Sequence, residues 1–284
     1  MTILEARNLS YIYPNSEKTA IEDINLAIER REFVLLTGPS GCGKTTLCRC
    51  FNGLIPHFYG GRLKGEVIVV GLKTTEHPIY ELAKHVGLVF QNPENQLFAL
   101  TVEKDVAFGL ENLGLPRDEI RRRVEWALKV TGIYNLRDKA PFELSGGQQQ
   151  RVAIASVLAM QPEIIVLDEP TSFLDPLSAR NILETIHQLN LELGKTVILV
   201  EHRLDLAVKY ASRIIIMDRG RIIIDDEPKK VFLDDRIRLV GVGIPKVIRL
   251  YHALREDGVE LGKVPLSPDE TSELIMEVLK LDRG

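Results

Sequence analysis

The feature that most constrains the fold is a glycine-rich octapeptide between an apolar run and a helix-forming segment. Residues 38–45 read Gly-Pro-Ser-Gly-Cys-Gly-Lys-Thr and match G-x-x-x-x-G-K-[ST] at every required position. The flanking residues predict a strand over Phe33–Thr37 and a helix over Thr45–Phe51. In this setting, backbone amides, a helix N-terminus and Lys44 together hold phosphates. The pattern predicts an α/β fold with a phosphate cradle and disfavours an ordinary glycine-rich turn.

A second apolar run, Ile164–Leu167, ends in two carboxylates, Asp168 and Glu169. Four consecutive large aliphatic residues indicate a strand buried on both faces, as in a parallel sheet. At its carboxyl end, Asp168 is expected to reach a metal ion held by the Thr45 hydroxyl. Glu169, one residue further out, is placed to polarise a water molecule. The alternative is a strand that ends in an acidic turn.

Two more apolar runs end in polar side chains. Gln91 follows Val86–Phe90, and His202 follows Thr196–Glu201. Ligands of open α/β sheets bind beyond the carboxyl ends of the strands. We therefore expect the Gln91 amide to contact Mg²⁺ or the water, and His202 to contact a γ-phosphate. A histidine after a strand is otherwise usually structural.

A second anion-binding segment reads Leu-Ser-Gly-Gly-Gln over Leu144–Gln148. Ser145 stands where the N-cap of a helix over about Gln148–Met160 belongs. Its hydroxyl and the amides of Gly146 and Gly147 can point at an anion. The alternative is a glycine-rich helix start without a ligand.

Taken together, these segments resemble the ATP-binding cassette (ABC) ATPase family. The resemblance covers about residues 1–225, with the motifs in family order: Walker A at Gly38–Thr45, the Q-loop at Gln91, the signature at Leu144–Gln148, Walker B at Ile164–Glu169, the D-loop at Ser172–Asp175 and the switch histidine at His202. Tyr13 resembles the aromatic residue that stacks on adenine, with Tyr11 as the second candidate. An ordinary strand aromatic is the alternative for Tyr13.

The resemblance implies a P-loop core, an antiparallel β subdomain and a helical signature subdomain at about residues 92–160. It implies ATP and Mg²⁺ as cofactors, and a nucleotide held between two chains, identical or paralogous. The expected catalytic residues are Glu169, His202 and Gln91, and the expected metal ligands are Thr45, Gln91 and Asp168. The expected nucleotide-binding residues are Tyr13, Gly38, Pro39, Ser40, Gly41, Cys42, Gly43, Lys44, Thr45, Thr46, Ser145, Gly146, Gly147 and Gln148.

One position departs from the family pattern. Phe173 stands in the D-loop where the family usually has a small residue, so we expect the seam between two chains to differ there. Glu169 and His202 are both present, so the site is expected to be catalytically competent.

Phe90–Phe98 resembles the extended Q-loop of energy-coupling factor transporter ATPases, which serve importers of vitamins and of cobalt or nickel. The resemblance implies a short helix, here about Asn95–Phe98, in the groove that meets an integral membrane coupling subunit. The alternative is a polar loop in which Pro93 stops the chain from being helical. A substrate-capturing membrane subunit is the further expected partner.

The last residues, 226–284, form a predicted C-terminal appendage. Ile244–Arg255 predicts an amphipathic helix that opens at a proline, and Ser267–Glu270 predicts a capping-box start for a second helix. The second helix carries apolar residues at helical spacing: Leu274, Ile275, Val278 and Leu279. The appendage resembles the dimerisation element of energy-coupling factor ATPases. A helical extension docked only on its own chain is the alternative.

Composition narrows the function classes. The 284 residues carry a net charge of −4, which does not indicate a nucleic-acid-binding surface. We find no apolar run of bilayer length and no signal-peptide pattern, so the expected location is peripheral, at the cytoplasmic face of the membrane. Chromosome-associated relatives insert long coiled coils between cradle and signature, whereas about a hundred residues without heptads separate Lys44 from Ser145. The ATPase of another ABC importer type remains open, as does the substrate.

Overall fold

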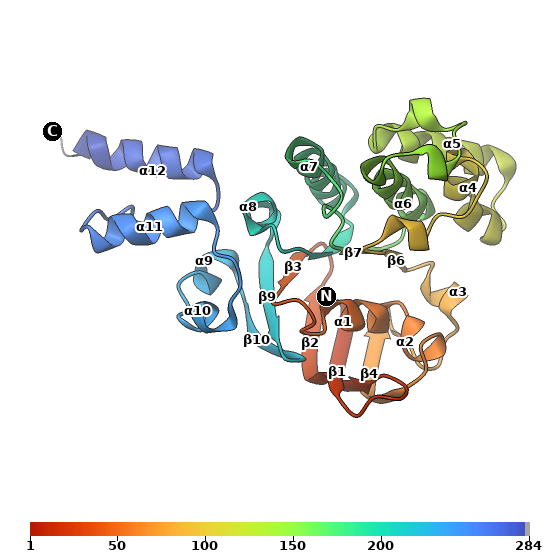
Figure 1. Ribbon diagram of the computed structural model, residues 1–284, viewed down its shortest axis with the longest axis horizontal. Helices are drawn as coiled ribbons and strands as arrows, with labels where there is room; N and C mark the ends of the chain where they lie inside the picture. The colour runs from red at the N-terminus through yellow and green to blue at the C-terminus, as the bar shows by residue number, and fades with distance from the viewer. Residues whose placement is uncertain (282–284) are drawn as a thin grey trace.

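The computed structural model describes residues 1–281 and contains a six-stranded and a four-stranded sheet (Figure 1). The six-stranded sheet has the order β10-β9-β3-β8-β7-β6. The strands β3 and β6 to β9 are parallel, and β10 pairs antiparallel with β9. Their bounds are β3 Phe33–Thr37, β6 Val86–Val89, β7 Ile164–Asp168, β8 Thr196–Val200, β9 Arg213–Asp218 and β10 Arg221–Asp226.

The four-stranded sheet is antiparallel and has the order β2-β1-β4-β5. Its bounds are β1 Thr2–Ile12, β2 Thr19–Glu29, β4 Arg62–Val69 and β5 Leu72–Lys73. It packs on one face of the parallel sheet, with α1 (Lys44–Phe51) between the two (Figure 1).

The three central strands β3, β7 and β8 are buried at every position. Successive side chains of a strand point to opposite faces, so each strand contributes to two hydrophobic clusters. On the face covered by α7 (Pro176–Leu193) lie Phe33, Leu35, Ile165, Leu167, Val197 and Leu199. On the face covered by α1 and the antiparallel sheet lie Val34, Leu36, Ile164, Val166, Ile198 and Val200. Coverage of both faces explains the uninterrupted apolar runs in the sequence.

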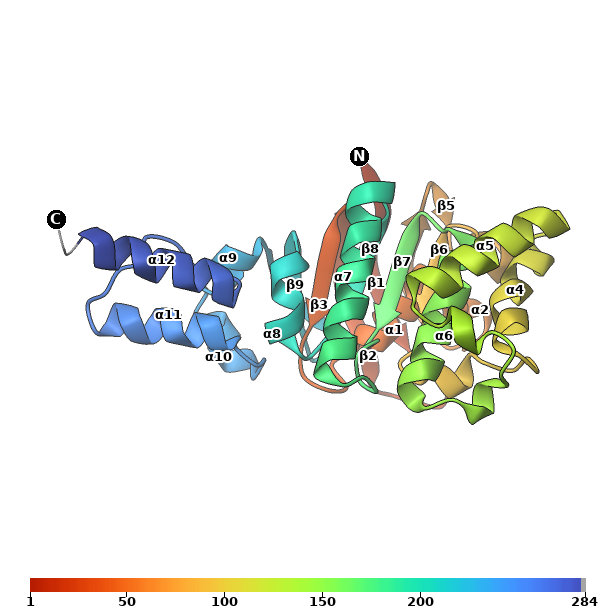
Figure 2. The ribbon, with the colours of Figure 1, turned by 90° about the horizontal axis from the view of Figure 1, so that it is seen from above.

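A helical block lies at one end of the molecule, with a hydrophobic cluster of its own (Figures 1 and 2). Its principal helices are α4 Val102–Asn112, α5 Arg117–Val130 and α6 Gly146–Met160. Three 3₁₀ turns join it to its surroundings: η1 Pro93–Asn95, η2 Tyr134–Leu136 and η3 Pro141–Glu143. The remaining short elements before the C-terminal part are α2 Leu54–His57, α3 Ile79–Leu82, α8 Leu204–Ala207 and η4 Val208–Tyr210.

The C-terminal helices extend from the opposite end, where α11 and α12 lie side by side (Figures 1 and 2). Their bounds are α9 Pro228–Val231, α10 Arg236–Val240, α11 Lys246–Glu256 and α12 Pro268–Leu281. The two predicted long helices are confirmed, and α11 begins directly after Pro245. Residues of this part, including Phe232 and Ile248, join the cluster beneath α7 and anchor the appendage to the sheet. No described helix is long and apolar enough to cross a membrane.

The start of α12 differs in detail from the predicted capping box. The Ser267 hydroxyl accepts the Glu270 N–H at 3.1 Å, as expected for an N-cap. The Glu270 carboxylate, however, accepts the Leu266 N–H at 2.8 Å and pairs with Lys229 Nζ at 2.9 Å. The reciprocal bond is therefore shifted from the Ser267 N–H to the Leu266 N–H, and the carboxylate also contacts α9.

The predicted helix over Asn95–Phe98 is wrong. The short helix is η1, which begins two residues earlier because Pro93 occupies its first position, where a missing N–H costs nothing. The Asn92 side chain caps this turn by accepting the Glu94 N–H at 3.1 Å. Phe98 has left helical geometry, and its N–H bonds to the Asp105 carboxylate instead. The proline starts the turn and does not stop it.

Candidate active site

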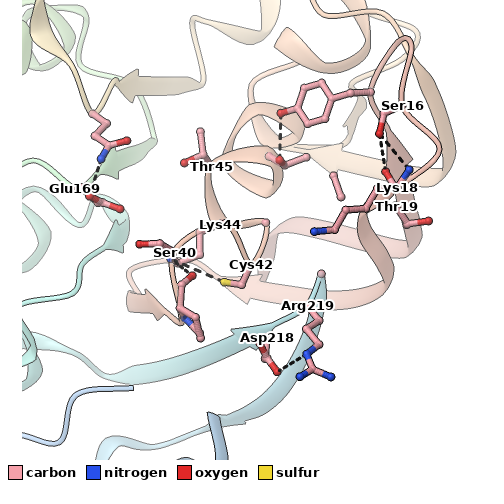
Figure 3. A pocket seen from close by; sticks show the side chains of 18 residues that line it. Ser16, Lys18, Thr19, Ser40, Cys42, Lys44, Thr45, Glu169, Asp218 and Arg219 are labelled. Atoms are coloured by element: carbon pink, nitrogen blue, oxygen red, sulfur yellow. Dashed lines mark hydrogen bonds and ion pairs between the residues drawn. The ribbon is translucent and has the colours of Figure 1, made fainter. Parts of the chain in front are cut away.

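A cavity of about 790 Å³ lies at the carboxyl ends of the parallel strands (Figure 3). Three segments far apart in the sequence border it: the glycine-rich loop, the chain between β1 and β2, and the turn between β9 and β10. Glu169 lies across the cavity from Lys44 and Thr45 (Figure 3). The lining residues are Tyr13, Ser16, Lys18, Thr19, Ala20, Pro39, Ser40, Gly41, Cys42, Gly43, Lys44, Thr45, Thr46, Gln91, Glu169, Asp218, Arg219 and Gly220.

Two glycines of the loop are required by close backbone contacts. Gly38 has φ +150°, and a Cβ there would lie 2.1 Å from the carbonyl oxygen of Met217. Gly43 has φ +109°, and its Cβ would lie 2.6 Å from the carbonyl oxygen of Ala20. The strands β9 and β2 therefore press on the loop from two sides. Because Gly43 also precedes α1 without a side-chain cap, the amides of that helix start are free to meet an anion.

The Lys44 ammonium lies buried within the loop and is held by neutral partners. Nζ donates to the carbonyl oxygens of Gly38 at 2.9 Å and of Pro39 at 3.0 Å. No carboxylate forms an ion pair with Lys44 among the described residues. The Cys42 thiol lies 3.8 Å from Nζ, and burial raises the pKa of this thiol although the Lys44 charge opposes the effect. An entering phosphate would meet an uncompensated positive charge.

The Asp168 carboxyl lies at the end of β7 with one oxygen left unpaired. Oδ1 is buried and has no hydrogen-bond partner among the described residues. Burial raises the pKa of Asp168, and the neighbouring Thr45 hydroxyl works against this shift. A buried, unpaired carboxylate oxygen beside a hydroxyl fits Mg²⁺, which takes few protein ligands together with phosphate oxygens and water. No cluster of three or more His, Cys, Asp or Glu side chains that could hold a metal occurs within residues 1–281.

Side chains from the ends of three strands meet at Glu169. Gln91 Nε2 donates to Glu169 Oε2 at 2.8 Å, and His202 Nε2 lies 3.0 Å from Glu169 Oε1. Glu169 itself has φ +50°, a left-handed conformation that costs a non-glycine residue on the order of 1–3 kcal/mol. The parallel sheet thus brings together three residues that the sequence placed after separate apolar runs.

The two candidate adenine-stacking residues occupy different environments. Tyr13 is half-buried on the cavity wall, and its hydroxyl lies 3.1 Å from Thr46 Oγ1. Tyr11 is fully buried, donates to the Gly60 carbonyl oxygen at 2.9 Å, and has its pKa raised to about 12, first of all by burial. The second candidate, Tyr11, was therefore wrong, because it cannot reach a base in the cavity.

The second anion-binding segment does not line this cavity. α6 begins at Gly146, and Ser145 caps it through a capping box with Gln148: the Ser145 hydroxyl accepts the Gln148 N–H at 3.4 Å, and Gln148 Oε1 accepts the Ser145 N–H at 3.0 Å. Ser145 and Gly146 are exposed. Phe173 lies beside them, since a Cβ on Gly146 would come within 3.7 Å of the Phe173 Cβ.

Sequence reasoning missed the turn between β9 and β10 as part of the cavity. The Gly220 N–H donates to the Cys42 carbonyl oxygen at 2.9 Å, so this turn holds the glycine-rich loop. The strands β9 and β10 form an antiparallel hairpin, and nothing in its residues indicated a contact with a loop so distant in the sequence. Sequence reasoning also gave no role to Glu201 and Arg203, which flank His202. Two charged residues beside the end of an apolar strand were the available signal.

Comparisons with known proteins agree with this geometry. The family model described as ABC transporter matches residues 21–172. An ABC transporter ATP-binding protein of Pyrococcus horikoshii is 46% identical over 281 residues, covering 99% of this chain and 97% of the relative. The energy-coupling factor transporter ATP-binding protein EcfA1 of Caldanaerobacter subterraneus is 44% identical over 278 residues, covering 96% and 98%.

Two solved structures extend the comparison. The structure of cbiO1 from Clostridium perfringens, part of the ABC transporter complex cbiONQ, matches with a TM-score of 0.73 and 38% identity over 88% of this chain and 99% of that one. The ATP-binding cassette MJ0796, dimeric and bound to ADP and Pi, matches with a TM-score of 0.71 and 33% identity, covering 80% and 99%. The chain belongs to the ABC transporter ATP-binding family and is an ATPase of that class. Its resemblance to the energy-coupling factor group is confirmed.

Proposed function

We propose that this chain is the ATP-hydrolysing subunit of an energy-coupling factor importer for vitamins or transition-metal ions. Two such subunits, identical or paralogous, close around two ATP molecules and thereby drive the membrane subunits. The observation that carries the proposal is the meeting of Gln91, Glu169 and His202 across the cavity from the cradle. The printed names of EcfA1 and of cbiO1 from cbiONQ support the transporter type.

In this proposal the residues of the glycine-rich loop bind ATP, and the residues at the ends of the strands promote its hydrolysis. Lys44 and the loop amides hold the β- and γ-phosphates, and Tyr13 stacks on the adenine. Thr45, Asp168 and Gln91 would hold Mg²⁺, which would neutralise phosphate charge when bound. Glu169 polarises the attacking water, and His202 contacts the γ-phosphate. Gln91 and His202 contact one Glu169 oxygen each, which leaves the carboxylate further lone pairs that can accept a hydrogen bond from water.

The second grip on each nucleotide comes from the other subunit. Ser145 and Gly146 are exposed and lie outside the cavity of their own chain, whereas the start of α6 suits an anion. The dimeric MJ0796 cassette supports such an arrangement. We further propose that residues 1–225 form the cassette and that the appendage, 226–284, adds to the dimer contact. Apolar side chains exposed on α12 support this role, with Met276 at 51% and Leu279 at 49% exposure.

The integral coupling subunit is proposed to dock beside the Q-loop. A second cavity of about 490 Å³ is bordered by Phe58, Phe90 and Gln91. The Gln91 side chain also donates a hydrogen bond to Glu169. Two large apolar side chains nearby in sequence are exposed, Phe98 at 65% and Leu100 at 75%. Phe98 packs against Phe108, which is also exposed, and contiguous apolar side chains exposed in this way mark interaction sites. A partner bound here would act on Gln91 and so on Glu169, with this chain itself lying peripherally at the cytoplasmic face of the membrane.

Copurification from solubilised membranes tests this function. The tagged wild-type chain should recover an integral coupling subunit and a small substrate-capturing membrane protein, whose identity would give the substrate. Phe98→Glu should reduce recovery at least about tenfold while leaving ATP binding unchanged. Leu191→Glu, at an exposed leucine near the end of α7, is the matched control and should recover the partners normally. Recovery of no membrane protein, or of DNA in its place, would refute the proposal.

A further inference from the structure

Glu201 is a buried carboxylate that the reaction described above does not use. It follows β8 directly, is 3% exposed, and forms no ion pair with a lysine or arginine among the described residues. A buried charge is tolerated only when hydrogen bonds replace its lost hydration. Each Glu201 oxygen meets two donors. Oε1 accepts the Thr171 N–H at 3.3 Å and the Thr171 hydroxyl, and Oε2 accepts the backbone N–H groups of His202 at 3.1 Å and Arg203 at 3.2 Å.

These bonds join the ends of two strands that carry the reacting side chains. Thr171 lies two residues after Glu169, and His202 directly follows Glu201. The carboxylate thus bridges the chain after β7 and the chain after β8. Glu169 Oε1 and His202 Nε2 are 3.0 Å apart in the same region. The bridge fixes the backbone from which both side chains extend.

Arg203, on the other side of His202, also bonds to the chain after β7. Its Nη1 donates to the carbonyl oxygens of Thr171 at 3.3 Å and Leu174 at 3.2 Å, the two ends of the turn 171–174. This turn also supports the start of α6. A Cβ on Gly147 would lie 3.1 Å from Leu174 Cδ2 and 3.3 Å from the Phe173 carbonyl oxygen.

We propose that Glu201 and Arg203 are positioning residues for ATP hydrolysis. They hold the turn 171–174 so that His202 meets Glu169, and so that Phe173 and Leu174 support the glycines at the start of α6. The proposal rests on the roles given above to Glu169 and His202. It adds that the hydrogen bonds of Glu201 and Arg203 with the turn 171–174, here called the bracket, set two things within the same chain. They fix the surroundings of His202 and the position of the second anion-binding segment at the start of α6.

Glu201→Gln tests the bracket with little change of shape. The amide NH₂ would face N–H donors at one end of the side chain, so the bridge should open. In the ATPase assay we expect kcat to fall at least about tenfold while the KM for ATP and the affinity for a fluorescent ATP analogue stay within about twofold of wild type. Thr171→Val should act in the same way, whereas Thr171→Ser, which keeps the hydroxyl, should retain most of the wild-type kcat.

Asn190→Ala is the control for a purely structural loss. Asn190 is buried and its amide bonds to the carbonyl oxygens of Arg31 and Lys195, away from the nucleotide cavity. This variant should lower the melting temperature and leave kcat unchanged. The proposal is overturned if Glu201→Gln and Thr171→Val both keep the wild-type kcat, or if Asn190→Ala loses kcat in the same proportion to its stability. A wild-type chain without turnover in the assembled complex would instead contradict the ATPase assignment itself.

Discussion

Glu169 carries the most specific chemical role proposed for a single residue. Its carboxylate lies between Gln91 and His202, across the cavity from the cradle. Glu169→Gln keeps the side chain's shape and removes its basicity. We expect ATP binding to persist and hydrolysis to fall about 10²- to 10⁴-fold, the range typical of a lost general base. Steady-state phosphate release with parallel nucleotide titration measures both; turnover at the wild-type rate would remove Glu169 from this role.

Gly38 gives a stability prediction with a matched control. A methyl group at Gly38 would collide with the Met217 carbonyl oxygen, in a backbone conformation that already disfavours a side chain. Gly38→Ala should cost more than about 2 kcal/mol and abolish ATP binding. Gly71→Ala also places a side chain at positive φ, +82°, but meets no atom within 4 Å, so about 1 kcal/mol and normal ATP binding are expected. Urea unfolding and nucleotide titration of both variants would show equal effects if the contact with Met217 were unimportant.

At the scale of elements, the strands were predictable and the contacts between distant segments were not. β3 and β7 each begin with four consecutive apolar residues because both of their faces are buried, so the pattern appears directly in the sequence. Ser145 likewise indicates the start of α6, because N-capping is a local interaction. The bond from Gly220 to Cys42 and the bracket at Glu201 depend on residues brought together by the fold. The start of η1 was misplaced because Pro93 is compatible with both a helix stop and a helix start.

The packing of α7 against β3 predicts a pH effect on stability. His187 on α7 lies against Phe33 and Tyr210, with ring centroids 5.8 and 5.0 Å away. Burial lowers the pKa of His187 below its usual value of about 6.5, and the Lys209 charge acts in the same direction. The unfolded chain therefore takes up the proton first as the pH falls, so stability should decrease below about pH 6.5 and should not depend on this group well above it.

His187→Phe isolates this effect, since phenylalanine fits the aromatic cluster and does not titrate. When the pH is lowered from about 7.5 to about 5.5, the urea midpoint of unfolding should decrease more in the wild type than in the variant. An identical fall in both proteins would show that the pH dependence arises from other groups.

At the scale of the whole molecule, α4 to α6 and the pair α11–α12 occupy opposite ends of the parallel sheet (Figure 2). We propose that the first end contacts the membrane partner and that the second end adds to the dimer contact made through the start of α6. Met276→Asp with Leu279→Asp should weaken self-association at least about tenfold in sedimentation experiments while ATP binding stays normal. Leu191→Asp, at an exposed leucine near the C-terminal end of α7, lies outside both the appendage and the D-loop and is the control for an added surface charge. Unchanged association in the double variant would assign α12 to its own chain alone.

The central claim is that each ATP is held by the cradle of one chain and by the Ser145 helix start of another. Ser145→Arg in the assembled complex tests it most directly, with Ser267→Arg at the N-cap of α12 as a control for the same change at another helix start. We predict that Ser145→Arg reduces ATP turnover at least about 100-fold while the isolated chain still binds ATP, and that Ser267→Arg leaves turnover within about twofold of wild type. Wild-type turnover in the Ser145→Arg complex would contradict the account.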